Sequence, residues 1–552
     1  MDVLTDQLTD EQRLVADAPA DARLLVVAGP GTGKTHTLVR RAAALGTADD
    51  MGRTVLALSF TRAVVEEVRE RARETGDQRV RAMTLDSFAA RCVLDRGETL
   101  EGGFDATVRR ATELIESGAV PLDLEHVLVD EIQDLVGPRG PFVLALLTQA
   151  RCGFTLFGDP AQAIFDHEST EAERPFLERL TELEPLDRLE LTADHRRAGS
   201  DGVTPRPDVP GAIAEHLRDL PRVSSTQQLA TMARLAPGTF AVLTRTNGEA
   251  LDLAAQLVDL GVPDVHVRQP ADAVATPAWI ARLVNGDPRR EWSRRTIEPA
   301  LEMLAGAPDP APAWRMLRHI SGEPADRVTL AALRNGIANG RLPFERKAPG
   351  GVTVSTIHRA KGLEWDHVAI LAPRVLDLDQ PEERVYYVAC TRSRADTRRL
   401  ERPKLDGVLR QTGDGRWTLR GWRGGLRRIE CRFGDVDQSP AAPEPTLATD
   451  AQERLARRVA PGDLVEIVHV AGRLELHHSG VPIATMSSEF AEVLARLTDL
   501  DRVDRLTGPR ILTIRAVAGS ADAGEQVGLP ATGIWLCPEI SGFADIERGG
   551  QE

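Results

Sequence analysis

One segment, RLLVVAGPGTGKTHTLVRRAA at residues 23–43, constrains the fold more than any other part of the chain. Residues 24–28 have the apolar character of a buried strand, a glycine-rich turn follows, and a helix is expected from about Lys34. This order of strand, turn and helix is the P-loop arrangement, although Ala28 stands where the general pattern has its first glycine. The segment therefore predicts an α/β fold with a phosphate-binding turn at the end of a strand.

Each residue type in this P-loop has a physical task in binding ATP. The glycines allow the backbone to curl so that its amides face the phosphates. Lys34 reaches the β- and γ-phosphate oxygens, and the Thr35 hydroxyl ligates Mg²⁺. The nucleotide-binding residues expected from the loop are Gly29, Gly31, Thr32, Gly33, Lys34 and Thr35.

A second apolar run, HVLVDEIQDL at residues 126–135, ends in carboxylates. A P-loop fold needs one carboxylate at a strand end for the metal and another to activate water. We therefore expect Asp130 to hold Mg²⁺ and Glu131 to act as the catalytic base. An acidic strand end alone is usually a solvated loop, but the position after the P-loop, with Gln133 and Asp134 following, favours the catalytic interpretation.

Length and charge limit the class of protein. A chain of 552 residues is long enough for three or four domains. Its 42% hydrophobic and 27% charged residues are typical of globular proteins. The formal net charge of −15 excludes a protein coated in basic surface, so any contact with nucleic acid must come from a local basic groove.

The cysteines and the N-terminal sequence bear on the compartment. The five cysteines include no CxxC pair, which argues against a disulfide framework or a zinc site. The start, MDVLTDQLTDEQ, lacks the basic and apolar regions of a signal peptide, and no apolar run approaches the roughly 20 residues that span a bilayer. A cytoplasmic protein without membrane insertion is expected. The cysteines are Cys92, Cys152, Cys390, Cys431 and Cys537.

Eight further blocks follow the order of motifs in the UvrD, PcrA and Rep group of superfamily 1 helicases, and the resemblance spans roughly residues 6–400. LTDEQRLV resembles the Q motif, LALSFTRAVVEEVRER motif Ia, MTLDSFAAR motif Ib and LFGDPAQAIF motif III. LELTADHRR resembles motif IV, FAVLTRTN the strand that follows it, VSTIHRAKGLEWDHV motif V and EERVYYVACTRSR motif VI. The resemblance implies two RecA-like P-loop lobes of the α/β class that use ATP and Mg²⁺.

The resemblance also assigns roles around the nucleotide. Gln12 would contact the adenine edge, Gln162 would sense the γ-phosphate and Glu364 would bind the ribose side. Arg196 and Arg392 would neutralise charge on the γ-phosphate, with Arg392 supplied by the second lobe. Two histidines, His36 and His195, stand where the family usually has an arginine and a tyrosine. Both can stack on a purine, and they could make nucleotide affinity depend on pH.

A motor that moves along a single strand needs sequence-tolerant contacts, namely phosphate ligands and aromatic faces. By resemblance Phe60 and Phe165 stack on bases. The stacking tryptophan and arginine that many family members carry after motif III are absent, which weakens the expectation of strand separation. RNA also stays open as a track. The phosphate or sugar contacts expected by resemblance are Thr61, Arg62, Ser87, Arg245, Thr356 and His358.

The sequence favours an ATP-dependent translocase or helicase on single-stranded DNA, and the form of motifs V and VI resembles the 3′-to-5′ branch. One alternative is a DNA-dependent regulatory ATPase or defence-system subunit that acts with a partner nuclease and unwinds little alone. A fused nuclease is disfavoured because the tail shows no clustered Asp, Glu and Lys set and has no lysine after Lys404.

Changes in composition suggest the domain boundaries. The Pro- and Ala-rich acidic stretch DVDQSPAAPEPTLATD predicts a linker, and short strand-like runs predict a β-rich domain after it, which could bind DNA or a protein partner. The expected domains are a first lobe at residues 1–225 with a short insertion near 93–122, a second lobe at 236–262 and 350–427, a mostly helical insertion at 263–349, a linker at 436–450 and a β-rich domain at 451–552.

Overall fold

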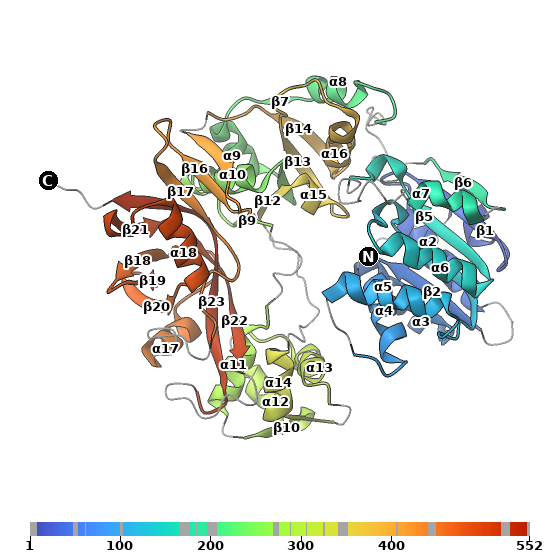
Figure 1. The fold of residues 1–552 in the computed structure, drawn as a ribbon, viewed down its shortest axis with the longest axis horizontal. Helices are drawn as coiled ribbons and strands as arrows, with labels where there is room; N and C mark the ends of the chain where they lie inside the picture. Colours follow the sequence, from blue (N-terminus) through green and yellow to red (C-terminus); the bar gives the residue numbers. More distant parts are fainter. Residues whose placement is uncertain are drawn as a thin grey trace. The chain divides into compact units, whose positions relative to one another are not determined.

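The computed structural model divides the chain into two compact units, which are described separately (Figure 1). The first comprises Met1–Leu220 and Arg374–Asp396, and the second comprises Pro221–Pro373 and Thr397–Glu552. The structure describes residues 8–47, 53–60, 62–99, 103–164, 176–183, 185–193, 195, 207–268, 275–287, 289–304, 306–323, 326–339, 351–404, 407–439, 449–519 and 530–548.

The first unit is built on a six-stranded sheet with the order β3-β2-β4-β5-β1-β6, in which every neighbouring pair is parallel. Strands β4 and β5 are buried along their whole length, as expected for central strands of a parallel sheet covered on both faces. Parallel order brings the carboxyl ends of β1, β4 and β5 to one edge. The strands are β1 (Arg23–Ala28), β2 (Thr54–Ser59), β3 (Val80–Thr84), β4 (Leu124–Val129), β5 (Gly153–Gly158) and β6 (Asp187–Leu191).

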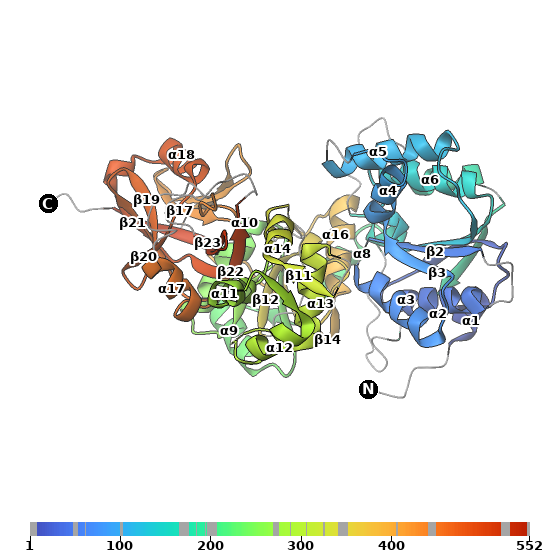
Figure 2. The same ribbon diagram turned by 90° about the horizontal axis from the view of Figure 1, so that it is seen from below.

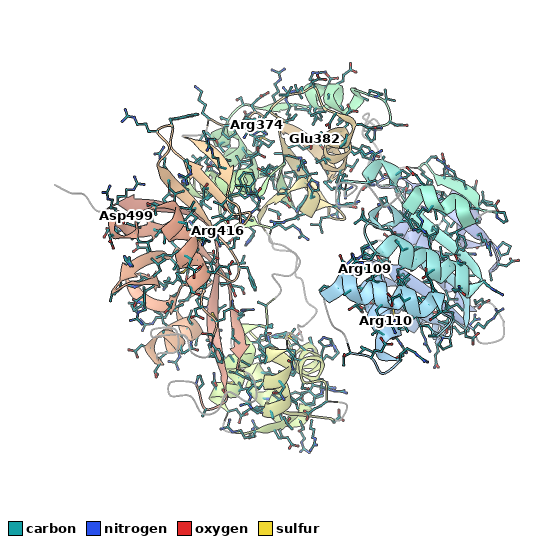
Figure 3. All side chains as sticks on the ribbon, in the orientation of Figure 1. Arg109, Arg110, Arg374, Glu382, Arg416 and Asp499 are labelled. Atoms are coloured by element: carbon teal, nitrogen blue, oxygen red, sulfur yellow. The ribbon has the colours of Figure 1, made fainter. Side chains whose placement is uncertain are left out.

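Helices cover both faces of this sheet (Figure 2). One face packs on α1 (Asp10–Ala16), α2 (Lys34–Thr47) and α3 (Arg62–Thr75), and the other on α4 (Leu85–Leu94), α5 (Gly103–Glu116) and α6 (Arg139–Ala150). Arg109 and Arg110, labelled in Figure 3, lie on α5. The remaining elements of this unit are η1 (Ile132–Asp134), η2 (Pro160–Gln162), α7 (Phe176–Arg179), η4 (Leu180–Leu183), α8 (Ala212–Asp219) and α16 (Gln380–Cys390).

Arg41 on α2 fixes the end of α1. Its side chain is only 1% exposed, and it donates hydrogen bonds to the carbonyl oxygens of Ala16 at 3.3 Å, Pro19 at 2.7 Å and Ala18. A guanidinium can serve several carbonyls at once because its five N–H donors form a planar fork. This anchor matters for the site because α1 carries Gln12.

The second unit contains a six-stranded sheet with the order β7-β14-β13-β8-β12-β9, and its β12–β8, β12–β9, β13–β8 and β14–β7 pairs are parallel. The expected fold class is confirmed, since each unit has a parallel sheet with flanking helices. The elements are β7 (Arg222–Val223), α9 (Thr226–Leu235), β8 (Phe240–Thr244), α10 (Asn247–Asp259), β9 (Val265–Val267), β12 (Val352–Thr356), α15 (Ile357–Ala360), β13 (Trp365–Leu371) and β14 (Ser393–Leu400).

A nine-stranded antiparallel sheet forms the expected β-rich C-terminal region, but it begins earlier than expected. Residues 408–427, which we assigned to the second lobe, belong to this sheet because β17 pairs with β23. The strands are β15 (Val408–Gln411), β16 (Trp417–Arg420), β17 (Leu426–Cys431), β18 (Glu466–Val470), β19 (Arg473–His478), β20 (Val481–Thr485), β21 (Val503–Thr507), β22 (Arg510–Ala518) and β23 (Ile534–Arg548).

The inserted helices share one hydrophobic core with this sheet. Trp314, Leu317 and Leu333 from the insertion are buried in the same cluster as Ile514 and Leu536 from the β22–β23 hairpin. No helix within the described ranges of either unit is long and apolar enough to cross a membrane. The remaining elements are α11 (Ala278–Gly286), β10 (Glu291–Ser293), α12 (Arg294–Glu302), α13 (Pro310–Ser321), β11 (Arg327–Thr329), α14 (Leu330–Ala338), α17 (Thr449–Arg457), α18 (Ser488–Leu497) and η5 (Leu500–Arg502).

We predict that Arg41→Leu destabilises the first unit by about 1–3 kcal/mol, because the buried carbonyls at the end of α1 lose their donors. Urea unfolding followed by circular dichroism measures the loss, and hydrogen exchange should become faster in α1. Arg13→Leu is the control, since Arg13 lies on the same helix with 56% of its side chain exposed. An effect of Arg41→Leu no larger than that of the control would contradict the anchoring role.

Candidate nucleotide-binding site

The turn between β1 and α2 has the backbone geometry of a phosphate cradle. Gly31 and Gly33 have φ angles of 78° and 77°, in the left-handed region that favours glycine. The Thr32 hydroxyl donates to the Gly29 carbonyl at 2.8 Å, and α2 begins directly at Lys34. The first amides of α2 therefore follow the turn, and a helix N-terminus favours an anionic ligand.

Gln12 lies directly against this turn. Thr9 and Gln12 form a capping box that starts α1, and Gln12 Nε2 donates to the Thr32 carbonyl at 3.0 Å. The same nitrogen lies 3.3 Å from Nε2 of His195, whose own amide donates to the Gly31 carbonyl at 2.9 Å. The structure thus brings Gln12 and His195 to the P-loop, where sequence reasoning expects the adenine, and their adenine contacts stay a prediction.

His36, the second histidine expected near the base, is half-buried on the first turn of α2. Burial lowers its pKa below the usual value, the nearby Glu67 opposes this, and His195 and Arg71 lower it further. The Nε2 atom of His36 is buried and has no hydrogen-bond partner among the described residues. The lowered pKa favours a neutral His36 imidazole at pH 7.

The acidic pair lies at the end of β4, facing the P-loop lysine. Lys34 Nζ is 3.2 Å from Glu131 Oε2, and only 11% of the lysine side chain is exposed. Burial lowers the pKa of Lys34, but the carboxylates of Glu131, Asp130 and Asp159 outweigh it and hold the pKa above its usual value. Glu131 has a left-handed backbone with φ 52°, which is strained for a residue other than glycine.

Asp130 has the features of a metal ligand. It is 1% exposed, Ser59 Oγ donates to its Oδ2 at 3.4 Å, and its Oδ1 has no hydrogen-bond partner within the described residues. Burial and the neighbouring Glu131 charge raise its pKa to about 7, while Lys34 and hydrogen bonds oppose the shift. A hard divalent cation would satisfy the orphaned oxygen, so Asp130, with Thr35 on α2, suits Mg²⁺.

A chain of hydrogen bonds runs from Glu131 to Arg392 within the first unit. The Gln133 side chain donates to Glu131 Oε2, and its Oε1 accepts from the Asp159 amide at 3.0 Å. Gln162 Nε2 donates to Asp159 Oδ2 at 2.8 Å, and Arg392 Nη2 donates to Gln162 Oε1 at 3.1 Å. The loops after β4 and β5 and the end of α16 are therefore joined through polar side chains.

Two features of this network differ from the expectation. Residues 374–396, including Arg392, group with the P-loop unit and not with the second lobe, because α16 packs against η2 and α8. Asp159 was not singled out in the sequence. Asp159 directly follows β5, the strand between β4 and β1, and this position could have identified it as a residue of the site.

The expected DNA contacts of the first unit lie partly outside the described residues. Phe60 follows β2 and is half-buried against the core below α4 and α6. Ser87 is exposed in the first turn of α4, where its amide bonds to Thr84 Oγ1 at 3.2 Å. Arg62 begins α3. Thr61, Phe165 and Arg196, as well as the side chain of Arg62, lie outside the described part of the chain.

In the second unit, the expected contacts meet at one edge of the sheet. Thr244 and Thr356 are register partners at the ends of β8 and β12, so Arg245 and Thr356 lie side by side. Thr356 also caps α15, which carries His358, and its hydroxyl accepts from the Arg359 amide at 3.3 Å. Glu364 lies half-buried just before β13.

The glycine turn after β1 and the acidic pair after β4, on a sheet of this order, define a P-loop protein. Residues 11–167 match the family model of the AAA domain, and residues 351–397 match that of the UvrD-like helicase C-terminal domain. These two matches support the resemblance of the chain to the UvrD-like superfamily 1 helicases.

Curated relatives agree over a limited length. The ATP-dependent DNA helicase UvrD1 of Mycobacterium leprae (strain TN) is 39% identical over 110 residues, which are 19% of this chain and 14% of that protein. UvrD1 of Mycobacterium bovis (strain ATCC BAA-935 / AF2122/97) is 39% identical over 93 residues, or 17% and 12% of the two chains. The alignments thus span no more than 14% of the length of these relatives.

Solved structures show weaker likeness. The Pif1 helicase from Bacteroides, in complex with ADP-AlF3 and ssDNA, has a TM-score of 0.31 and 13% identity. That alignment covers 71% of this chain and 92% of the other. The Pif1 helicase from Candida albicans has a TM-score of 0.35 and 14% identity, with 71% and 95% covered.

The raised pKa of Asp130 predicts a pH dependence of stability. The usual pKa is 3.8 and the folded value is about 7, so the folded state holds more protons between these values. The free energy of unfolding contributed by Asp130 therefore falls as pH rises through this window. Asp130→Asn removes the titration, and we expect it to be more stable than the natural protein at neutral pH.

Urea unfolding without added Mg²⁺, at pH values near both ends of this window, tests the prediction. Asp123→Asn is the matched control, because Asp123 directly precedes the same strand and is not buried. The control should keep the natural pH slope. An unchanged slope in Asp130→Asn would show that this carboxyl does not titrate in the window.

Proposed function

We propose that the protein is an ATP-driven motor that moves along single-stranded DNA, with 3′-to-5′ polarity. The observation that carries the proposal is the polar chain from Lys34 and Glu131 to Arg392, which joins the groups that phosphoryl transfer requires. The names of the UvrD1 relatives, which are ATP-dependent DNA helicases, support DNA as the track.

The hydrolytic step follows from the positions of Lys34 and Glu131. Lys34 binds the β- and γ-phosphate oxygens, and its present partner Glu131 is then released to act as a base. A water molecule gives its proton to the Glu131 carboxylate while its oxygen attacks the γ-phosphorus. The bond from the γ-phosphorus to the bridging oxygen breaks, and ADP leaves with the electron pair. Asp130 and Thr35 would hold Mg²⁺, which would supply charge neutralisation at the phosphates.

Gln162 and Arg392 couple this chemistry to the rest of the chain. The Arg392 guanidinium is buried and held by Gln162, the Thr391 hydroxyl and the Val388 carbonyl. A γ-phosphate would compete for the same N–H donors, so loss of the phosphate would change the partners of Arg392. Because β14 begins directly after Arg392 and continues into the second unit at Thr397, such a change can be transmitted along the chain.

The track would use the residues expected from the sequence. Arg245, Thr356 and His358 form a polar edge at the ends of β8 and β12, suited to phosphate and sugar contacts. We assign Phe60, Thr61, Arg62, Ser87 and Phe165 to the first unit's part of the track, and Arg196 and Glu364 to the nucleotide.

A second candidate function is a DNA-dependent regulatory ATPase or defence-system subunit that acts with a separate nuclease. It is favoured by Asp166, His167 and Glu168 after Phe165, where many members of the family have a stacking tryptophan and an arginine. A strand-displacement assay on tailed duplexes separates the candidates and reports polarity. Robust unwinding by the isolated chain would exclude the second candidate.

We predict that oligo-dT stimulates ATP hydrolysis by the purified chain. Lys34→Ala and Glu131→Gln should each lower the stimulated kcat at least about 100-fold, since they remove phosphate binding and the base. Glu190→Gln, at an exposed glutamate of the same unit, is the control and should hydrolyse ATP normally. Hydrolysis that does not respond to DNA would contradict a DNA-dependent motor.

We also predict that Arg392→Lys lowers kcat about 1,000-fold with little change in the KM for ATP, because the planar guanidinium stabilises charge that develops in the transition state. Steady-state hydrolysis at saturating oligo-dT measures both constants. Arg394→Lys, two residues further on and exposed, provides the matched control. A rise in KM alone would assign Arg392 to nucleotide binding instead.

A further inference from the structure

Strands β15, β16 and β17, with the turns that join them, form an unusually basic surface on an acidic protein. We name this segment, residues 408–431, the arginine ribbon. It contains six arginines and two acidic residues, a net charge of +4, whereas the whole chain has −15. A local concentration of arginine on an acidic chain favours binding of a polyanion.

The two acidic residues of the ribbon, Asp414 and Glu430, already interact with groups at its base. Asp414 lies 3.6 Å from Arg416, which also binds Asp435 through two hydrogen bonds of 2.6 and 2.8 Å. Glu430 is buried and accepts from the Trp417 amide at 2.8 Å and from Arg432 at 2.8 Å. Both carboxylates therefore already have partners at the base of the ribbon.

The turn between β16 and β17 carries an exposed tryptophan, which two exposed arginines follow in the sequence. Trp422, at the turn between β16 and β17, is 76% exposed, whereas the other six tryptophans are buried or half-buried. Arg423 and Arg427 beside it are exposed, and the stem of Arg427 lies against Gly421. The tip of the ribbon thus exposes one tryptophan and two arginine side chains.

The base of the ribbon is fixed to α10, so its tip is presented by a rigid support (Figure 1). The Trp417 ring packs on Gly248, where an added Cβ would lie 2.6 Å from the ring. Asp252 on α10 lies 3.3 Å from Arg428, which also binds Asp545 at 2.6 Å. Arg428 therefore holds the ribbon against α10, and we do not assign it to ligand binding.

The same support joins the ribbon to the polar edge of the second unit's parallel sheet. Asn247, the first residue of α10, accepts from Arg359 Nη1 at 2.8 Å and donates to Glu430 Oε1 at 2.5 Å. Arg359 lies on α15 with His358, and Arg245 lies two residues before Asn247. The proposed DNA contacts at the ends of β8 and β12 are thus connected by hydrogen bonds to the ribbon.

We propose that the tip of the arginine ribbon is a second binding site for single-stranded DNA, in which Trp422 stacks on a base and Arg423 and Arg427 contact phosphates. An exposed indole with flanking guanidinium groups is the combination that binds single strands without sequence preference. Stacking requires an unpaired base, which favours a single strand over a duplex. The choice of DNA over RNA rests on the proposed function.

The exposure of this tryptophan allows a direct test with the full-length chain. Oligo-dT should quench the intrinsic fluorescence, and Trp422→Phe should lose most of the quenching while still binding. Trp422→Ala should raise the Kd for fluorescein-labelled oligo-dT at least about fivefold, the lower end of the loss of one base stack. Leu464→Ala, at another exposed apolar residue of the unit, should leave the Kd unchanged.

The arginines are tested through the salt dependence of binding. The double variant Arg423→Gln with Arg427→Gln should reduce the slope of log Kd against log salt by about 1.4, because each neutralised phosphate contributes about 0.7 to that slope. The matched control is Arg496→Gln with Arg502→Gln, two exposed arginines of the same unit on α18 and η5. Equal thermal unfolding of both double variants would show that the tip is not needed for folding.

The outcomes separate this proposal from the proposed function. If oligo-dT quenches Trp422 but does not stimulate hydrolysis, the ribbon proposal stands and the motor proposal fails. If hydrolysis is stimulated while quenching, Kd and salt slope are the same in all variants, the ribbon proposal is overturned, and a protein partner becomes the better occupant. Stronger quenching and tighter binding by oligo-U than by oligo-dT would overturn the assignment to DNA.

Discussion

The contact on which the nucleotide site depends is the partly buried ion pair between Lys34 and Glu131 at one edge of a parallel sheet. Three carboxylates, those of Asp130, Glu131 and Asp159, act on a single ammonium group there. Such an excess of negative charge in a poorly solvated site raises the free energy of the folded state unless a proton or a cation binds there. The raised pKa of Asp130 expresses this cost, and a magnesium-bound nucleotide would relieve it.

The sheet order explains why distant parts of the sequence meet at this edge. Strands β4, β5 and β1 are adjacent and parallel, so the loops that follow them are neighbours. Gln133 and Asp159 link these loops through one side chain and one amide, and Gln162 extends the connection to Arg392. Each of these four residues is at least 95% buried, so their hydrogen bonds act where water competes little.

The parts of the site that can be predicted from the sequence are those whose pattern lies within one short segment. The P-loop and the acidic pair could be placed because strand, turn and helix follow one another within a few residues. The neighbours of Arg392 could not be predicted, since nothing in the sequence around α16 indicates that this helix packs on η2 and α8. The limit of the second lobe was misplaced for a similar reason: β17 takes its partner from β23, more than a hundred residues later. Gly542, which has a φ of 118°, lies inside β23. A glycine there makes it hard to predict from the sequence that the strand continues beyond the apolar run at its start.

The shared core of the inserted helices and the C-terminal hairpin has a consequence for biosynthesis. Helices α11 and α14 leave the ribosome long before β22 and β23, against which they pack. During that interval the apolar residues of α11 and α14 lack their final neighbours, and such exposed apolar surface promotes aggregation. The parallel sheet of the first unit has no such delay, because all of its strands, β1 to β6, precede residue 192. The nascent chain would therefore form its P-loop sheet early and depend on chaperones chiefly while the second unit is being made.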